Sequence, residues 1–127
     1  MKRLVHRKAR RKRAQGPAKP LKMHISKGDR VKVIRGAQKG TEGAVLEVFP
    51  RKHQVVVEGV RIVSKHRRPT ADDQGGIVKL AAPIDASNVM LLDPKSGAPT
   101  RVRRQKDKDG TVERLSVRSG QPIPRSR

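Results

Sequence analysis

Apolar and basic positions alternate in a segment that begins near residue 30. Between Arg30 and Arg35, Val31 and Val33 alternate with basic residues, which is the period-two pattern of a strand with one buried and one charged face. Short apolar runs follow at residues 44–49 and 55–57. Short strands separated by a turn about every 8–12 residues predict a small β-barrel or sandwich.

The second half of the chain continues this pattern. Apolar runs at residues 77–80 and 87–93 predict two more strands. Asp109-Gly110 is a hairpin signal whose sides would be residues 101–104 and 111–117. Long helical periodicity is missing from the sequence, so we expect a mainly β protein.

Changes in composition divide the chain into four segments. We interpret residues 1–23 as a basic N-terminal arm, 24–66 as a barrel core, 67–120 as a C-terminal β extension and 121–127 as a flexible, frayed tail. Ser64–Pro69 is basic and is expected to be irregular.

The predicted core is thin. Only 33% of residues are hydrophobic, and Phe49 is the sole aromatic beside Val, Leu, Ile and Ala. We therefore expect modest stability on its own, which a partner that binds only the folded state would raise.

The chain carries a formal net charge of +21, from 32 Lys and Arg against 11 Asp and Glu. A compact domain with this charge repels itself, so a polyanionic partner is expected. A membrane surface is disfavoured, because there is no Trp or Tyr to build the apolar face of an amphipathic helix. With no cysteine, disulfides and Cys-based zinc sites are excluded.

Half of the excess charge lies in the N-terminal arm, where a block of like charge is typical of a segment that orders on nucleic acid. The alternative is a merely solubilising tail. The arm residues that we expect to contact RNA are Arg7, Lys8, Arg10, Arg11, Lys12 and Arg13.

Three glycines, Gly36, Gly40 and Gly43, lie between the first two predicted strands. This spacing indicates a tight turn with positive φ, or backbone pressed against another group. Together with the flanking valines and Lys39, it resembles the KOW motif of ribosomal proteins and transcription elongation factors.

The resemblance extends well beyond this motif. Residues 55–68 (VVVEGVRIVSKHRR), Gly75-Gly76-Ile77, Ser87-Asn88-Val89 and Asp93-Pro94-Lys95 occur in the order found in the bacterial large-subunit ribosomal protein family L-twenty-four. The similarity runs from about Ile25 to Gly120. It implies an SH3-like β-barrel with a C-terminal extension, early binding to large-subunit ribosomal RNA, and a loop near the polypeptide exit tunnel.

The resemblance and the charge pattern together give a set of residues expected to contact ribosomal RNA by neutralising phosphate. For Lys32 and Arg35, the solvated face of a strand remains an alternative. The residues are Lys27, Arg30, Lys32, Arg35, Lys39, Lys65, His66, Arg67, Arg68, Arg101, Arg103 and Arg104. By family position, the candidate tunnel-exit loop contains Arg51, Lys52 and His53.

The expected partners are large-subunit ribosomal RNA and neighbouring ribosomal proteins, with the nascent chain as a further candidate. The expected location is the cytoplasm, in the large ribosomal subunit. Two departures from the family pattern stand out. The arm precedes the usual start of the family, and Arg103-Arg104-Gln105 replaces a common Gly-aromatic pair.

Catalytic, cofactor and metal sites are not expected. His6, His24, His53 and His66 lack ligand spacing, and Asp72-Asp73 is typical of a solvated turn. Motifs of hydrolases and P-loop enzymes are missing from the sequence, so we expect neither an enzyme nor a small-molecule substrate. The alternatives are a KOW-type transcription factor and a nonspecific nucleic-acid-binding protein.

Overall fold

The computed structural model describes residues 19–125. It is mainly β, as expected, and within this range its only helical segment is a 3-10 turn, η1 (Ala86–Asn88). The strands are β1 (Arg30–Val33), β2 (Glu42–Phe49), β3 (Gln54–Val57), β4 (Ile62–Arg67), β5 (Gly76–Ala81), β6 (Ile84–Asp85), β7 (Val89–Leu92), β8 (Pro99–Thr100), β9 (Val102–Lys106) and β10 (Val112–Ser116).

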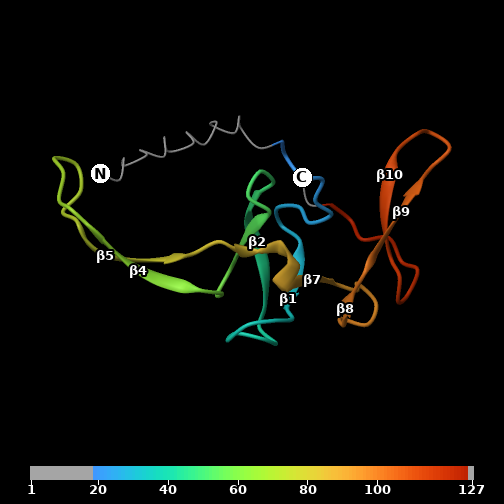
Figure 1. The fold of residues 1–127 in the computed structure, drawn as a ribbon, viewed down its shortest axis with the longest axis horizontal. Coiled ribbons are helices and arrows are strands. Elements are labelled where there is room, and N and C mark those ends of the chain that lie inside the picture. The colour runs from blue at the N-terminus through green and yellow to red at the C-terminus, as the bar shows by residue number, and fades with distance from the viewer. Residues whose placement is uncertain (1–18, 126–127) are drawn as a thin grey trace, which may run out of the picture.

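Six strands form one curved antiparallel sheet in the order β6-β3-β2-β1-β7-β8. The edge strands β6 and β8 are not paired with each other. The SH3-like barrel that we expected is mainly β but is therefore open rather than closed. Two hairpins, β4–β5 and β9–β10, pair only within themselves among the described strands. Figure 1 shows them extending to opposite sides of the barrel strands, which makes the molecule elongated.

The core is built from the alternation seen in the sequence. Val31 and Val33 of β1 are buried while Arg30 faces solvent, and Val31 lies opposite Leu91 of β7. β-branched residues suit this role because they pack well on a pleated surface. The buried cluster comprises Ile25, Val31, Val33, Val45, Val55, Val57, Val60, Ala86, Val89, Leu91 and Ile123.

The structure departs from the sequence-based expectation for Phe49. Its side chain is half-buried at the end of β2 and lies outside the buried cluster. The core is therefore aliphatic throughout, and Leu91 is its largest fully buried apolar side chain.

Ser64–Pro69 is not irregular, because most of it belongs to β4. Each residue from Ile62 to Arg67 pairs with β5, from Ile62 opposite Ala81 to Arg67 opposite Gly76. Every residue of β4 is exposed, so the strand has no buried face and lacks the alternation that would have revealed it. Pairing with β5 across the loop at residues 68–75, rather than an alternating pattern of its own, makes this strand.

The end of the chain is also more ordered than its composition suggested. We expected fraying from Gln121 onward, but Ile123 is only 9% exposed and belongs to the core. The Ile123 N–H donates to the Arg114 carbonyl at 2.7 Å, and the Ser116 N–H donates to the Gln121 carbonyl at 2.8 Å. Up to Arg125, this segment is held against β10.

Candidate nucleic-acid interface

The glycine-rich connection between β1 and β2 is a tight turn on the surface. Gly36 and Gly40 have φ of 105° and 93°, a region that residues with a Cβ rarely adopt. The Gly40 N–H donates to the Val33 carbonyl at 2.7 Å and closes the turn. Arg35 and Lys39 are consequently held exposed at its rim.

Gly43 has the close backbone approach that the glycine spacing predicted as the alternative to a turn with positive φ. A Cβ on Gly43 would lie 2.5 Å from the Glu58 carbonyl oxygen and 2.9 Å from Cγ1 of Val57. No side chain fits between β2 and the end of β3 at this point. The motif thus combines a left-handed turn with a close approach of two backbones.

Arg61 joins the glycine turn, although the sequence did not single it out. Its N–H donates to the side-chain oxygen of Gln38 at 2.6 Å, and its guanidinium donates to the Pro83 carbonyl at 2.8 Å. It has φ of 49°, unusual for a residue with a side chain. Arg35 and Arg61 line the same surface hollow of about 430 Å³. The position of Arg61 beside the glycine turn depends on hydrogen bonds to residues more than 20 positions away, which the local sequence does not show.

Of the predicted contact residues in the barrel, Lys32 is the least available to a partner. Its ammonium lies 3.0 Å from Oε1 of Glu42, directly opposite on β2. Lys27 and Arg30 are exposed near the start of β1. The structure therefore separates Lys32, which has its own counter-ion, from exposed cations that do not.

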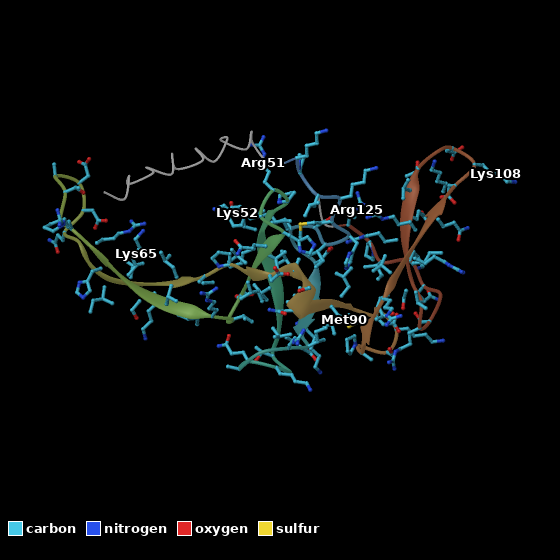
Figure 2. The ribbon with its side chains drawn as sticks, viewed as in Figure 1. Arg51, Lys52, Lys65, Met90, Lys108 and Arg125 are labelled. Carbon is cyan, nitrogen blue, oxygen red and sulfur yellow. The ribbon has the colours of Figure 1, made fainter. Side chains whose placement is uncertain are left out.

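The β4–β5 hairpin divides the basic cluster of residues 65–68 between two faces. Successive strand residues point to opposite faces, so Lys65 and Arg67 share one face and His66 lies on the other. Arg68 follows the strand and is exposed. Figure 2 shows Lys65 far out on this hairpin. The cluster is a two-sided arm rather than a single patch.

Apolar side chains are exposed on the same hairpin. Ile62 and Ile77 are 56% and 63% exposed, and Val63 and Leu80 are 42% and 40% exposed. Large aliphatic side chains at this density on a projecting element mark a surface that a partner covers. The hairpin therefore offers both charge and apolar area.

The connection between β2 and β3 holds the candidate tunnel-exit residues in a short turn. Arg51 and Lys52 are exposed (Figure 2), whereas His53 is half-buried with φ of 55° and its Nδ1 lies 3.4 Å from Oδ1 of Asp85. Hydrogen bonds from Ser87, first its N–H and then its hydroxyl, lower the pKa of Asp85. The Leu21 N–H donates to the Pro50 carbonyl at 3.1 Å, so the N-terminal segment passes beside this turn.

The three predicted arginines near β9 also separate. Val102 and Arg104 lie on one face of β9, while Arg103 lies on the other, opposite Leu115 of β10. Arg101 precedes the strand, and all three arginines are exposed. At the tip of this hairpin, Lys108 extends the basic surface to the far end of the molecule (Figure 2). The arm residues Arg7 to Arg13 lie outside the described range, so their predicted role stays a prediction.

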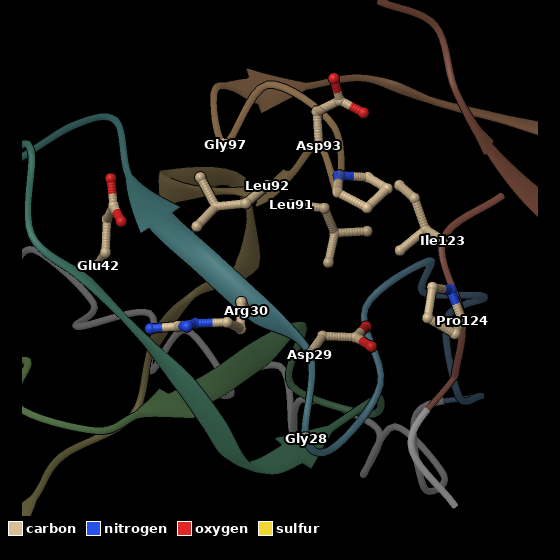
Figure 3. Close-up of a pocket in the computed structure, with 11 residues that line it drawn as sticks. Gly28, Asp29, Arg30, Glu42, Leu91, Leu92, Asp93, Gly97, Ile123 and Pro124 are labelled. Carbon is tan, nitrogen blue, oxygen red and sulfur yellow. The ribbon is translucent and has the colours of Figure 1, made fainter. Parts of the chain in front are cut away.

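A second hollow, which we call the acidic pocket, lies between β1, the end of β7 and the C-terminal segment and has a volume of about 490 Å³. Figure 3 shows Leu91 and Ile123 between the carboxylates of Asp29 and Asp93, with Glu42 across from them. Asp29 and Glu42 are paired with Arg114 and Lys32, respectively. Among the described residues, Asp93 has no cationic partner and Arg30 is the only basic residue in the lining, so this pocket is unsuited to phosphate.

Two buried carboxylates here were not identified from the sequence. Asp29 binds the guanidinium of Arg114, and Asp93 accepts hydrogen bonds from the hydroxyls of Ser119 and Ser96. The hydrogen bond from Ser119, followed by that from Ser96, holds the pKa of Asp93 well below its usual range. The carboxylate of Asp29 is thus used to join distant segments of the fold, and that of Asp93 to hold Ser96 and Ser119.

Within residues 19–125, no group of three or more His, Cys, Asp or Glu residues is placed to hold a metal ion. The same range contains no helix that is long and apolar enough to cross a membrane.

Matches to two protein-family models cover most of this chain. The family model described as large ribosomal subunit protein uL24, C-terminal domain, matches residues 60–123, and the KOW motif model matches residues 27–58. The second match confirms the resemblance that the glycine spacing indicated.

Curated relatives named large ribosomal subunit protein uL24 align with nearly their whole length. The Oceanobacillus iheyensis protein is 50% identical over 102 residues, which are 80% of this chain and 98% of the relative. The Amoebophilus asiaticus protein is 47% identical over 83% of this chain and 92% of the relative. The Bacillus thuringiensis protein is 51% identical over 78% of this chain and 96% of the relative. The chain therefore belongs to the uL24 family of large ribosomal subunit proteins.

Proposed function

We propose that the protein is a structural constituent of the large ribosomal subunit and binds large-subunit ribosomal RNA through its exposed basic surfaces. One observation carries the RNA-binding role: the distribution of unpartnered positive charge. Among residues 19–125, the following predicted contact residues are exposed and have no carboxylate within ion-pair distance: Lys27, Arg30, Arg35, Lys39, Lys65, Arg68, Arg101, Arg103 and Arg104.

These side chains lie in four places: the start of β1, the glycine turn, the β4–β5 hairpin with the residue that follows β4, and the start of the β9–β10 hairpin. Phosphate contacts of this kind release counterions and position a protein on RNA without reading its bases. An elongated protein with basic elements at both ends is suited to bridge RNA segments that lie apart. The work of the protein would then be to hold folded RNA together.

The β4–β5 hairpin supports this assignment independently. A two-stranded hairpin with both faces in water is marginally stable at best. Its exposed aliphatic residues and its basic residues would both be satisfied within a ribonucleoprotein, where RNA phosphates and a neighbouring ribosomal protein cover it. We expect the hairpin to be better ordered in the subunit than in the free protein.

Membership in a family of structural ribosomal proteins implies that the protein is not an enzyme and that it acts in the cytoplasm in bacteria. From the family resemblance, we further propose early binding during subunit assembly and a position near the polypeptide exit tunnel.

Two elements are candidates to reach a nascent chain. The turn with Arg51, Lys52 and His53 is one, by family position. The β4–β5 hairpin is the other, because it projects from the barrel whereas the turn is held by its contacts to Asp85 and Leu21. Site-specific crosslinking from position 53 and from position 72 in translating ribosomes distinguishes them. Crosslinks to RNA alone from both positions would contradict the tunnel assignment.

The RNA-binding role is tested by sedimenting a lysate that contains the tagged full chain. At low salt we expect the protein to migrate with the large subunit, and high salt should release it. Migration with free protein at low salt would contradict the proposal. Comigration with RNA polymerase would favour the KOW-type transcription factor instead.

A further inference from the structure

A third hollow has the opposite charge to the acidic pocket. It has a volume of about 660 Å³ and lies between η1, β7, the end of β8 and the start of β9. Its polar lining includes His24, Arg101 and Arg104, and no carboxylate lines it. We call it the His24 hollow. Its volume falls within the roughly 300–1,000 Å³ typical of small-ligand sites.

The strand geometry explains why Arg104, and not Arg103, faces this hollow. Arg104 lies opposite Arg114 in the β9–β10 register, and Arg114 is buried with its guanidinium on Asp29. That face of the hairpin therefore points at the barrel, and Arg104 is held at its edge beside His24. Arg103 points away. Neither Arg101 nor Arg104 has an acidic partner within the range 19–125.

The rest of the lining is apolar. Met90 of β7 is half-buried there, and Val102 packs against the core cluster. Figure 2 shows Met90 at the middle of the molecule, away from the tips of both hairpins. The single aromatic residue of the chain, Phe49, does not line this hollow. The thioether of Met90 and the planar guanidinium groups can pack against a nucleobase in its place.

We propose that the His24 hollow holds one unstacked nucleotide of RNA, with its phosphate between Arg101 and Arg104 and its base against Met90 and Val102. This inference rests on the proposed RNA-binding function and sharpens it. A surface that contacts only the phosphates of an RNA duplex needs neither the apolar lining of Met90 and Val102 nor a hollow.

His24 adds a reporter to the site. Partial desolvation, followed by the positive charge of Arg104, lowers the pKa of His24, and Arg114 and His53 act in the same direction while Asp29 opposes them. The neutral imidazole can donate or accept a hydrogen bond at a base edge or a 2′-hydroxyl. A phosphate seated beside Arg104 would offset its charge and raise the pKa of His24 again.

The test compares a short single-stranded oligouridine with a blunt RNA duplex of equal phosphate number, by fluorescence anisotropy with the full chain. Arg104→Gln removes the charge-assisted hydrogen bonds to the phosphate and should weaken binding of the single strand about tenfold. The matched variant Arg103→Gln, on the same strand but facing away, should weaken both RNAs slightly and equally. Met90→Ala changes no charge and should weaken only the single strand.

The outcomes separate the inference from the function on which it rests. Equal effects of Arg104→Gln and Arg103→Gln, or equal loss for both RNAs, would overturn the nucleotide site while leaving RNA binding intact. If the unaltered chain bound neither RNA at low salt, the proposed function itself would fail. Because a variant could misfold, the His24 imidazole resonance of the unaltered protein gives a second readout. It should shift with the single strand and not with the duplex, and the reverse would contradict the proposal.

Discussion

Arg114 and Asp29 form a buried ion pair between segments that lie 85 residues apart, with Nη2 of the arginine 3.0 Å from Oδ1 of the aspartate. The guanidinium also donates to the carbonyls of His24 and Pro124, at 2.8 Å and 2.7 Å. Asp29 in turn accepts from the Ser26 N–H at 2.7 Å. A single arginine thus fastens the start of the barrel, the β9–β10 hairpin and the C-terminal segment together.

Replacing Arg114 by Met should be severely destabilising. The carboxylate of Asp29 would stay buried without its counter-ion, which typically costs about 3–5 kcal/mol of the free energy of unfolding. Urea denaturation of the variant measures this. Lys32→Gln serves as a control, because the Lys32–Glu42 pair is solvent-accessible and should contribute less than about 1 kcal/mol. Equal losses in the two variants would show that the buried pair does not fasten the fold.

Ile123→Ala tests whether the C-terminal segment is part of the core. Truncating a buried isoleucine leaves a cavity and typically costs about 2–5 kcal/mol, and we expect the lower end because Ile123 lies at the rim of the acidic pocket. Arg125→Ala, two residues on and exposed, should change the stability by less than about 0.5 kcal/mol. A frayed tail would instead make both substitutions neutral.

Asp93 predicts a pH dependence in the acid range. Its pKa is depressed in the folded protein by hydrogen bonds from Ser119 and Ser96, so its contribution to stability is fully present above the unfolded value of about 3.9. That contribution is lost as the pH falls from about 4 toward the folded pKa. Asp93→Asn should therefore be less stable than the unaltered protein at pH 6, and the difference should shrink at lower pH.

Urea unfolding of both proteins across this range measures the effect. Asp72→Asn removes one negative charge from an exposed loop and controls for net charge. A difference between the unaltered protein and Asp93→Asn that stayed constant down to pH 2 would contradict the assigned role of the carboxylate.

The sequence sufficed to predict elements that carry their own local signal. The alternation of Val31 and Val33, and the Asp109-Gly110 turn, predicted β1 and the β9–β10 hairpin, and both are present. Elements and contacts that show no alternating local pattern were missed. β4 has no buried face, Ile123 becomes core only by packing against strands far away, and Arg114 looks like any other basic residue in a basic chain. No local pattern distinguishes an arginine that meets a carboxylate 85 residues away from one that meets solvent.

The same distinction governs the candidate interface. Counting basic residues groups Lys32 with Lys65, but only Lys32 has a carboxylate beside it. We predict that Lys65→Gln reduces the slope of log K against log salt by about 0.7–0.9, the value for one phosphate contact, in binding to large-subunit ribosomal RNA. Lys32→Gln, with the same change in charge, should alter the slope much less. Equal changes would indicate that only net charge matters.

The most direct test of the central claim is the affinity of the full chain for large-subunit ribosomal RNA across a salt series, in competition with duplex DNA of matched length. We predict a steep linear loss of log K with log salt for both nucleic acids, and a preference for the ribosomal RNA that persists at every salt concentration. Equal affinity for the two at all salt concentrations, or no binding to the ribosomal RNA at low salt, would contradict the account.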